Sequence, residues 1–345
     1  MNKKLLYLGI DIGGAHIKIV GLDQFQNICL IKYRKCYLWK DPKKLKHEIN
    51  FINSLSNNKN ILCGLTMTAE LCDIFPDRLT GAKIILNECK KIKFKTFLYS
   101  NSKKVFERFQ SRNLSNLISM NWHSIGRYLA MFVNNAIVID FGSTTTDFVC
   151  IKNGKIMNKA FNDFTRLLNG EILYTGLIRT PIFAIKQNIK YKSKTINIIP
   201  EYFSKTSDIY RINKKIKKEF DIDDETDLSD KSIRGSYKRI ARSFGMDYHS
   251  KDKLFIEKIS KTIMNEQLNM ILKNTKELLN RFYMKKKPLI ILSGIGQEVL
   301  KDLFKNDNVQ LLADYFKSKN LLNKKIATYH APAACIAGLL AEVIE

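Results

Sequence analysis

Apolar and polar residues alternate in two segments of this chain, each interrupted by a short turn that carries glycine. The first segment is LLYLGIDIGGAHIKIVGLD (5–23), and the second is NAIVIDFGSTTTDFVCIKNG (135–154). Alternation with a period of two predicts β-strands, and glycine permits the sharp bend between them. Both segments are therefore predicted to be strand–turn–strand hairpins, with a carboxylate at each turn, Asp11 and Asp140.

The rest of the chain mixes further strands with helical periodicity. A third apolar strand lies in PLIILSGIGQEVL (288–300), where a Gly-x-Gly turn leads into a helix that opens at Gln297. Shorter strands are expected at 27–37 and 60–66. Apolar residues three and four apart, as in Ile256, Ile259 and Ile263, predict core-facing helices, and Leu254 is assigned to the same stripe. The expected helices are 42–55, 123–133, 231–244, 253–283 and the small-residue segment 330–345.

Three elements follow one another in a diagnostic order: an Asp-Gly-Gly hairpin, an Asp-Phe-Gly-Ser-Thr hairpin and a Gly-x-Gly strand–helix. They resemble the phosphate-1, phosphate-2 and adenosine segments of the actin, Hsp70 and hexokinase superfamily. The resemblance implies an α/β, two-domain actin/Hsp70/hexokinase-like fold, a duplicated ribonuclease-H-like fold with a central cleft. Residues 1–134 would form the first ATPase-type domain and 135–345 the second, which carries a helical insertion, with the last helix packing back on the first. The alternative is three unrelated βα turns.

Length and composition fit a globular protein of two domains. The chain has 345 residues, of which 45% are hydrophobic and 26% charged. No stretch approaches the length of a membrane span, and the apolar start lacks a signal-type cleavage site, so a cytoplasmic protein without membrane partners is expected. The cysteines and histidines are scattered without zinc-ligand spacing. The sequence leaves the oligomeric state open.

A net charge of +25 raises the question of nucleic-acid binding. The lysines, however, are spread along the whole chain, and no basic motif interleaved with aromatic residues is present. A solvated basic surface is therefore the favoured interpretation, and nucleic acid is not expected as a partner. Anionic small-molecule substrates would still benefit from the positive field.

The hairpin turns carry the chemistry of phosphate binding. Backbone amides of glycine-rich turns can cradle phosphate oxygens, and the two carboxylates Asp11 and Asp140 are the candidate ligands of Mg²⁺. Lys18 shares a strand face with His16, and a strand buried on both faces requires an anion or water beside such a cation, so Lys18 is a candidate phosphate contact. The candidate cofactor-binding residues are Gly13, Gly14, Lys18, Gly142, Ser143, Thr144, Thr145, Gly294 and Gly296.

An acidic group follows the strand ILCGLT in the segment MTAELCDIFPDRLTG. A helix would align Glu70, Asp73 and Asp77 on one face, where they could bind an amine, although Pro76 interrupts the turn. Arg78 follows at once as a further substrate candidate. Helix capping with a surface ion pair is the structural alternative.

Two further segments hold candidate substrate residues. Trp122 could stack on an aromatic ring and His123 could act as a general base, although a buried tryptophan and a core histidine are the default. In the loop 169–183, Tyr174 and Arg179 are candidate contacts, with Arg179 as a pyrophosphate clamp. The acidic stretch DIDDETDLSD (221–230) lacks the glycine and terminal glutamate of a calcium loop, so it is expected to be solvated.

Taken together, these motifs resemble the hydantoinase/oxoprolinase-like family tied to tetrahydromethanopterin-linked one-carbon metabolism. Coverage is nearly end to end, with Phe141 and Ser124 as departures from the usual pattern. The matching residues are Asp11, Gly13 to His16, Lys18, Met67, Thr68, Glu70, Leu71, Asp73, Phe75, Arg78, Asn121 to His123, Asp140, Gly142 to Asp147, Gly170, Glu171, Tyr174 to Gly176, Arg179 to Pro181 and Ala331 to Ala333.

The resemblance implies a transferase of methanofuran or methylofuran biosynthesis. Archaeal members include a synthase that joins an aminomethylfuran methyl pyrophosphate to the phenol oxygen of γ-glutamyltyramine and releases pyrophosphate. Asp11 and Asp140 would act through Mg²⁺. His123, or an acid of the Glu70 and Asp73 group, would take the phenolic proton or bind the amine, and Trp122 would flank an aromatic ring.

Two other functions remain open from the sequence. An ATP-dependent kinase, or an ATP-hydrolysing hydantoinase- or oxoprolinase-type enzyme, would place adenosine at Gly294 and Gly296 and use Asp140 as a base, so ATP stays open as a cofactor. A nucleotide-gated scaffold or nucleic-acid binder ranks last.

Overall fold

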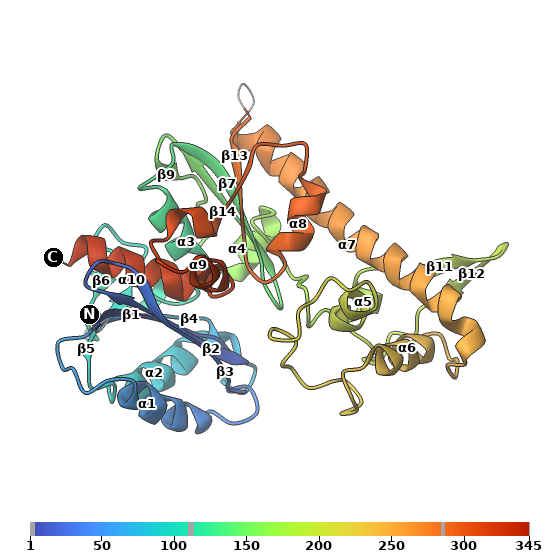
Figure 1. Ribbon diagram of the computed structural model, residues 1–345, viewed down its shortest axis with the longest axis horizontal. Helices are drawn as coiled ribbons and strands as arrows, with labels where there is room; N and C mark the ends of the chain where they lie inside the picture. Colours follow the sequence, from blue (N-terminus) through green and yellow to red (C-terminus); the bar gives the residue numbers. More distant parts are fainter. Residues whose placement is uncertain (1–3, 110–113, 284–286, 345) are drawn as a thin grey trace. The chain divides into compact units, whose positions relative to one another are not determined.

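The computed structural model describes residues 4–109, 114–283 and 287–344 (Figure 1). The chain forms two compact units, and neither is one continuous stretch of sequence. The first unit comprises Met1–Val138, Val149–Leu168 and Gln310–Glu345. The second comprises Ile139–Phe148 and Asn169–Val309.

The first unit is built on a six-stranded sheet of order β3-β2-β1-β4-β5-β6. The predicted first hairpin is confirmed, because β1 pairs antiparallel with β2 and places Asp11 opposite Lys18. The later strands β4 and β5 join β1 in parallel. The bounds are β1 Leu5–Ile12, β2 His16–Asp23, β3 Ile28–Lys35, β4 Leu62–Met67, β5 Lys95–Tyr99 and β6 Phe106–Glu107.

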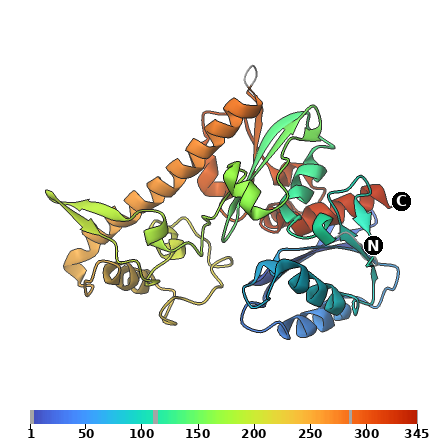
Figure 2. The ribbon, with the colours of Figure 1, turned by 180° about the vertical axis from the view of Figure 1, so that it is seen from behind.

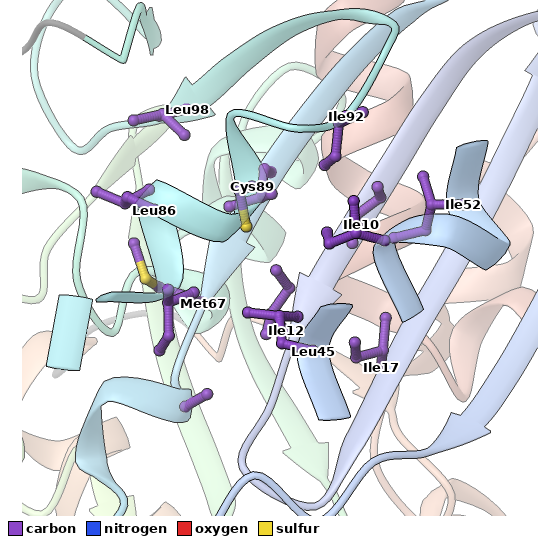
Figure 3. Close-up of a cluster of buried hydrophobic side chains, with 14 of the residues drawn as sticks. Ile10, Ile12, Ile17, Leu45, Ile52, Met67, Leu86, Cys89, Ile92 and Leu98 are labelled. Carbon is purple, nitrogen blue, oxygen red and sulfur yellow. The ribbon is translucent and has the colours of Figure 1, made fainter. Parts of the chain in front are cut away.

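One face of this sheet is apolar and is covered by two helices. Ile10, Ile12 and Ile17 are completely buried in a core that includes residues of α1 (Lys44–Ser54) and α2 (Arg78–Cys89) (Figure 3). Alternation along β1 sends these isoleucines to the helix side, so the intervening residues face the other way. The predicted helix at 42–55 is confirmed as α1.

The opposite face of the sheet is covered by the last helix, α10 (Ala331–Val343), which approaches β1 and β4 very closely. A methyl group on Gly9 would lie 1.9 Å from the carbonyl oxygen of Ala333. On β4, a methyl group on Gly64 would lie 2.5 Å from a side-chain carbon of Ile336. The two glycines therefore let the small-residue helix sit directly on the strands.

We expect Gly9→Ala to destabilise the first unit strongly. Since the obstacle is a backbone oxygen and not a flexible side chain, α10 would have to move, at a cost of about 3 kcal/mol or more in unfolding free energy. Chemical denaturation of the purified variant measures this cost. Leu254→Ala is the matched control, because that side chain is 78% exposed, and equal midpoints for the two variants would contradict the packing described.

The second sheet has the order β10-β8-β7-β13-β14, with β9 beside β8. It confirms the second hairpin as β7 and β8, and it confirms the third motif as β13 followed by helix α8 from Gln297. The bounds are β7 Asn135–Phe141, β8 Thr146–Lys152, β9 Lys155–Ile156, β10 Ile172–Leu173, β13 Leu289–Ser293, α8 Gln297–Leu303 and β14 Val309–Leu311. The two sheets repeat one order, with a hairpin beside a later strand, as β2-β1-β4 in the first and β8-β7-β13 in the second, which confirms the predicted α/β fold of the actin, Hsp70 and hexokinase type.

The second unit also contains a helical part built around the long helix α7 (Lys253–Phe282) (Figure 2). Its apolar stripe packs with α5 (Thr206–Ile212), α6 (Ile233–Arg242) and the hairpin of β11 (Asn188–Tyr191) and β12 (Lys194–Asn197). The stripe confirms the predicted core-facing helix through Ile256, Ile259 and Ile263. Leu254 was wrongly assigned to it, because the first turn of α7 projects this side chain into solvent.

The remaining elements are short. They are α3 (Asn121–Leu129), α4 (Asp163–Leu168), α9 (Leu321–Thr328) and the 3-10 turns η1 (Ala69–Leu71), η2 (Leu114–Asn116), η3 (Ile182–Ala184), η4 (Ser250–Asp252) and η5 (Leu312–Tyr315). Within the described ranges, no single helix has the length and apolarity needed to cross a membrane, although α9 and α10, bent by 113° at their junction, meet those criteria as a pair.

Candidate functional site

A row of polar side chains crosses the face of the first sheet that α10 covers. Asp11 pairs with Lys18 on β2, Lys18 pairs with Tyr33 on β3, and on the other side Asp11 pairs with Thr66 on β4. Residues opposite one another in a sheet share a face, so Tyr33, Lys18, Asp11 and Thr66 form one continuous row. Sequence reasoning found Asp11 and Lys18, but it missed Tyr33 and Thr66.

The carboxylate of Asp11 is the centre of the row. It is almost completely buried, and Lys18 Nζ donates a hydrogen bond to Oδ2 at 3.2 Å. Lys18 therefore has the nearby anion that its position on a buried strand requires. Among the described residues, neither Asp11 Oδ1 nor Thr66 Oγ1 has a hydrogen-bond partner, although both atoms are buried. Buried oxygens left in this condition mark a place where a ligand completes the hydrogen bonding.

Two histidine rings lie against Tyr33, at the end of this row. The ring of Tyr33 lies 4.7 Å from that of His16 and 5.1 Å from that of His330, measured between centroids. His330 directly precedes α10 and is buried, and burial lowers its pKa to about 3, with the positive field of Lys18 and His16 acting in the same direction. Its Nδ1 has no hydrogen-bond partner in the described part of the chain. The only sequence signal for His330 was its place before the Ala-Pro-Ala segment.

A second aromatic group lies around the start of α3. Tyr99 ends β5, and its hydroxyl lies 2.7 Å from His123 Nδ1. Burial lowers the pKa of His123 to about 3, aided by the charges of Arg127 and Arg166. His123 is therefore neutral near pH 7, and burial raises the pKa of Tyr99, which keeps its proton. When the Tyr99 hydroxyl donates to Nδ1, the ring proton of His123 resides on Nε2.

Trp122 is packed beside His123 and is almost completely buried. Phe161 stacks on its ring at 6.4 Å, and the guanidinium carbon of Arg166 lies 4.1 Å from the ring centroid. The indole Nε1 is buried and has no hydrogen-bond partner among the residues described. The polar edge of Trp122 is thus enclosed by protein without a hydrogen bond to the described residues.

Glu70 is the third buried polar centre of the first unit. Ser119 Oγ donates to Glu70 Oε1 at 2.7 Å, and Arg78 donates to Ser119 Oγ at 2.8 Å. Burial raises the pKa of Glu70 to about 7, against the opposing effects of the Ser119 hydrogen bond and the Arg78 charge. A carboxyl group that titrates near neutral pH is suited to proton transfer.

The acidic residues around Glu70 do not share one helix face, so that prediction was wrong. The 3-10 turn η1 ends at Leu71, and Asp73 lies in the following irregular segment with its side chain exposed, because the chain must bend before Pro76. Asp77 caps α2 by accepting a hydrogen bond from the Thr80 amide at 2.9 Å. The capping alternative is confirmed for Asp77, and the structure separates Asp73 from the buried Glu70.

In the second unit, the predicted phosphate turn is held by a segment far from it in sequence. The turn of residues 142–145 is closed by a hydrogen bond from the Gly142 amide to the Thr145 carbonyl at 2.9 Å. The amides of Leu177 and Arg179 donate to the carbonyls of Gly142 and Ser143 at 2.9 and 3.0 Å. The two motifs are therefore one structural element, in which Ser143 and Thr144 lie at the centre of the turn.

The Gly-x-Gly turn after β13 also meets the end of β7. The Gly296 amide donates to the carbonyl of Phe141 at 2.9 Å, and a methyl group on Gly294 would lie 2.7 Å from Asp140 Oδ1. Gly294 has a φ of +84°, a conformation that glycine adopts without strain. Asp140, the 142–145 turn, Gly294 and Gly296 are thus brought together within the second unit.

The acidic segment 221–230 is solvated only in part: Asp224 and residues 227–230 are exposed, as expected, but the expectation was wrong for Asp221, Asp223 and Glu225, which are buried. Asp221 and Glu225 are buried and receive hydrogen bonds from Arg211 at 2.9 and 2.8 Å. Arg239 in turn donates to Asp208 at 2.9 Å. Buried charges require partners of opposite sign, and the two arginines on α5 and α6 supply them, so the acidic segment is folded against those helices.

The other two substrate candidates of this unit differ in exposure. Arg179 is one-third exposed, and its Nε lies 3.9 Å from Asp223 of the acidic segment. Tyr174 is half exposed. The guanidinium of Arg179 therefore already has an acidic neighbour, with which an anionic substrate would compete.

The fit of Mg²⁺ to the carboxylate of Asp11 can be judged from the donor atoms. No cluster of three or more His, Cys, Asp or Glu side chains suited to a metal occurs among the described residues. Mg²⁺, however, keeps several waters and usually takes only one or two carboxylates besides substrate phosphates. The buried Oδ1 of Asp11, which lacks a partner, is such a hard oxygen donor, so the residues present are compatible with Mg²⁺ that arrives with a phosphorylated ligand.

Comparison with known proteins adds a family match. Residues 63–310 match the model of the hydantoinase/oxoprolinase family. The chain is 28% identical over 311 residues to a protein of Methanocaldococcus jannaschii named (4-{4-[2-(gamma-L-glutamylamino)ethyl]phenoxymethyl}furan-2-yl)methanamine synthase, covering 89% of this chain and 91% of that protein. It is 32% identical over 168 residues to a protein of the same name from Methanococcus vannielii, covering 49% of this chain and 74% of that protein.

Among solved structures, a ROK family glucokinase from Streptomyces griseus, in complex with glucose and AMPPNP, superposes with a TM-score of 0.49 at 11% identity. The superposition covers 97% of this chain and 98% of the glucokinase.

Proposed function

Since the chain belongs to the hydantoinase/oxoprolinase family, we propose that it is a transferase of methanofuran-type cofactor biosynthesis. It joins a furylmethyl group to the phenol oxygen of γ-glutamyltyramine, with release of pyrophosphate. The name of the Methanocaldococcus jannaschii relative describes the corresponding phenoxymethyl-furan product. The structural observation that carries the proposal is the buried polar row around Asp11, whose partnerless oxygens mark a ligand site.

The reaction makes one bond and breaks one. The phenol oxygen forms a C–O bond to the methylene carbon on the furan ring, while the bond from that carbon to the pyrophosphate oxygen breaks and its electron pair leaves with pyrophosphate. The furan ring stabilises positive charge at the methylene carbon. The enzyme therefore has two tasks: to stabilise the negative charge of the leaving group and to accept the phenolic proton.

The leaving group is assigned to the glycine turns and Lys18. The amides of Gly13 and Gly142 close their own turns by donating to the carbonyls of His16 and Thr145, so the amides of Gly14, Ser143 and Thr144 are the ones assigned to phosphate oxygens. The ammonium of Lys18 lies on the Asp11 row. Asp11 of the first unit and Asp140 of the second unit are each a candidate ligand of Mg²⁺. Bound to such a carboxylate, Mg²⁺ would act as a Lewis acid that neutralises phosphate charge.

Of the two candidate bases, Glu70 is the better acceptor of the phenolic proton. Its carboxyl group has a pKa near 7, and its buried Oε2 has no partner in the described structure. The pKa of His123 is about 3, which makes it a weak base. In the tautomer set by Tyr99 donation, His123 instead offers an N–H, so we assign it to substrate orientation.

The other candidate residues are assigned to substrate contacts. Trp122 would present its Nε1–H to the substrate, since Phe161 and Arg166 pack against its ring. Arg78, Asp73, Tyr174 and Arg179 remain candidate contacts for the charged ends of the two substrates. The expected partners are small molecules, and the expected location is the cytoplasm.

Product analysis tests the proposed function directly. Purified protein incubated with the aminomethylfuran methyl pyrophosphate, γ-glutamyltyramine and Mg²⁺ should form the aryl ether, detected by mass spectrometry. A competing ATP-dependent kinase or hydrolase is suggested by the meeting of the Gly-x-Gly turn with Asp140. That function predicts ADP formation from Mg-ATP and no ether from the pyrophosphate substrate.

A further inference from the structure

A short relay of side chains ends at Glu70. Arg78 donates to Ser119 Oγ at 2.8 Å, and Ser119 Oγ donates to Glu70 Oε1 at 2.7 Å. Glu70 and Ser119 are both nearly inaccessible to solvent. A serine hydroxyl has a single proton, so its donation to Glu70 fixes the orientation of the Ser119 hydroxyl. The Ser119 oxygen then accepts a hydrogen bond from the Arg78 N–H through a lone pair. The relay therefore engages Oε1 of Glu70 in a hydrogen bond of defined direction.

The backbone is specially arranged at the middle of this relay. Ser119 has a φ of +53°, in the left-handed region that residues with a side chain seldom adopt. Its neighbour Ile118 forms an isolated parallel bridge with Met67 at the end of β4. This bridge brings the segment before α3 alongside the chain that leads to Glu70. Strained backbone persists where surrounding structure holds it, and it is concentrated at functional sites.

Two polar atoms at the ends of the relay are left over. Glu70 Oε2 and Arg78 Nε are buried and have no hydrogen-bond partner in the part of the chain that the structure describes. If the relay served only stability, leaving a buried carboxyl oxygen and a buried guanidinium nitrogen without partners would be costly. The arrangement instead holds Oε1 and leaves Oε2 available.

We propose that Ser119 and Arg78 are positioning residues that hold Glu70 by Oε1, so that Oε2 accepts the phenolic proton of the substrate. This inference rests on the proposed function, because it assigns a proton acceptor for that reaction. The proton passes from the phenol to Oε2 as the phenol oxygen bonds to carbon, and it leaves with solvent after product release.

The groups that face Glu70 determine the sign of the expected pH effect. Burial raises the pKa of Glu70, whereas the Ser119 hydrogen bond and the positive charge of Arg78 on α2 lower it. The neighbouring carboxylates are directed elsewhere: Asp77 caps α2 and Asp73 is exposed. Removing the Ser119 hydroxyl should therefore raise the pKa of Glu70 above about 7.

The test compares the pH dependence of kcat/KM in wild type, Ser119→Ala and Ser119→Gly. A base must be ionised, so the rate falls on the acid side, with a midpoint near 7 for the wild type. Loss of a hydrogen bond to a charged group should move this midpoint up by about one pH unit in both variants. Gly accepts a positive φ without strain, so Ser119→Gly separates loss of the hydroxyl from backbone strain.

The outcomes separate this inference from the proposed function. Ether formation with an upward shift in both variants supports the relay, whereas ether formation with an unmoved midpoint overturns it and leaves the proposed function standing. Absence of ether with the wild type at every pH contradicts the proposed function. In that case, infrared titration of the Glu70 carboxyl band, identified by its loss in Glu70→Gln, still tests the relay. An equal midpoint in wild type and Ser119→Gly would refute it.

Discussion

Asp11→Asn and Asp140→Asn should each lower kcat for ether formation by about 10³-fold or more. Asparagine keeps the shape of aspartate but removes the negative charge, so the variant loses the electrostatic attraction that would hold Mg²⁺ against the departing pyrophosphate. A loss of several kcal/mol of leaving-group stabilisation corresponds to this factor. Steady-state kinetics with saturating Mg²⁺ measures it.

These two variants are tested with a check of the fold and with a control variant. Asp11→Asn also leaves Lys18 without its anionic partner, so its fold should be verified by circular dichroism. Asp302→Asn is the matched control, because Asp302 is a mostly exposed carboxylate paired with Lys215, and its activity should equal that of the wild type. Full activity in either Asp11→Asn or Asp140→Asn would remove that residue from the catalytic proposal.

Glu70→Gln should lower kcat by about 10²- to 10⁴-fold, the usual contribution of a general base. The remaining rate should lose the acid-side inflection near pH 7, because the group that titrates there is gone. Glutamine is nearly isosteric and can still accept the Ser119 hydrogen bond, so the site geometry is preserved. A pH–rate profile between pH 5 and 9 measures both effects.

His123→Gln is the informative comparison for Glu70. Since the pKa of His123 is about 3, its charge does not change over the working pH range. We expect kcat to fall by less than about tenfold, which corresponds to the free energy of one hydrogen bond. The acid-side inflection of the pH–rate profile should stay unchanged. If His123→Gln abolished the inflection and Glu70→Gln preserved it, the two roles would be reversed.

The parts of the fold that depend on local pattern were predictable from the sequence. Each hairpin is determined by its local sequence, because the alternation of apolar and polar residues specifies the strands and glycine specifies the turn, as in the β1–β2 pair. The helix after Gly296 follows from the same local reasoning. Asp11 and Asp140 were identifiable because each lies at the end of an apolar run, just before a glycine turn.

The composition of the site was less predictable, because it depends on which distant strands become neighbours. Thr66 joins Asp11 only through the parallel register of β4 with β1. Ser119 and Glu70 are 49 residues apart and meet across a buried hydrogen bond, which no local spacing indicates. His330 reaches the row because α10 returns to the first sheet.

In the acidic segment 221–230, by contrast, a clear local pattern led to a wrong prediction for the buried carboxylates. A run of carboxylates normally indicates solvation, and the sequence alone offers no sign that α5 and α6 present arginines to it. Arg211 pairs with Asp208, Asp221 and Glu225, and Arg239 also pairs with Asp208 and Glu225. These opposite charges meet only in the folded state, so the burial of Asp221, Asp223 and Glu225 is a tertiary effect.

The stoichiometry of the reaction without nucleotide tests the central claim most directly. Purified protein, Mg²⁺, the furan pyrophosphate and γ-glutamyltyramine are combined in the absence of ATP, and ether and pyrophosphate are both quantified. The account predicts one pyrophosphate for each ether formed, at a rate that added ATP leaves unchanged. Ether formation that requires ATP, or that releases ADP in proportion to product, would contradict it.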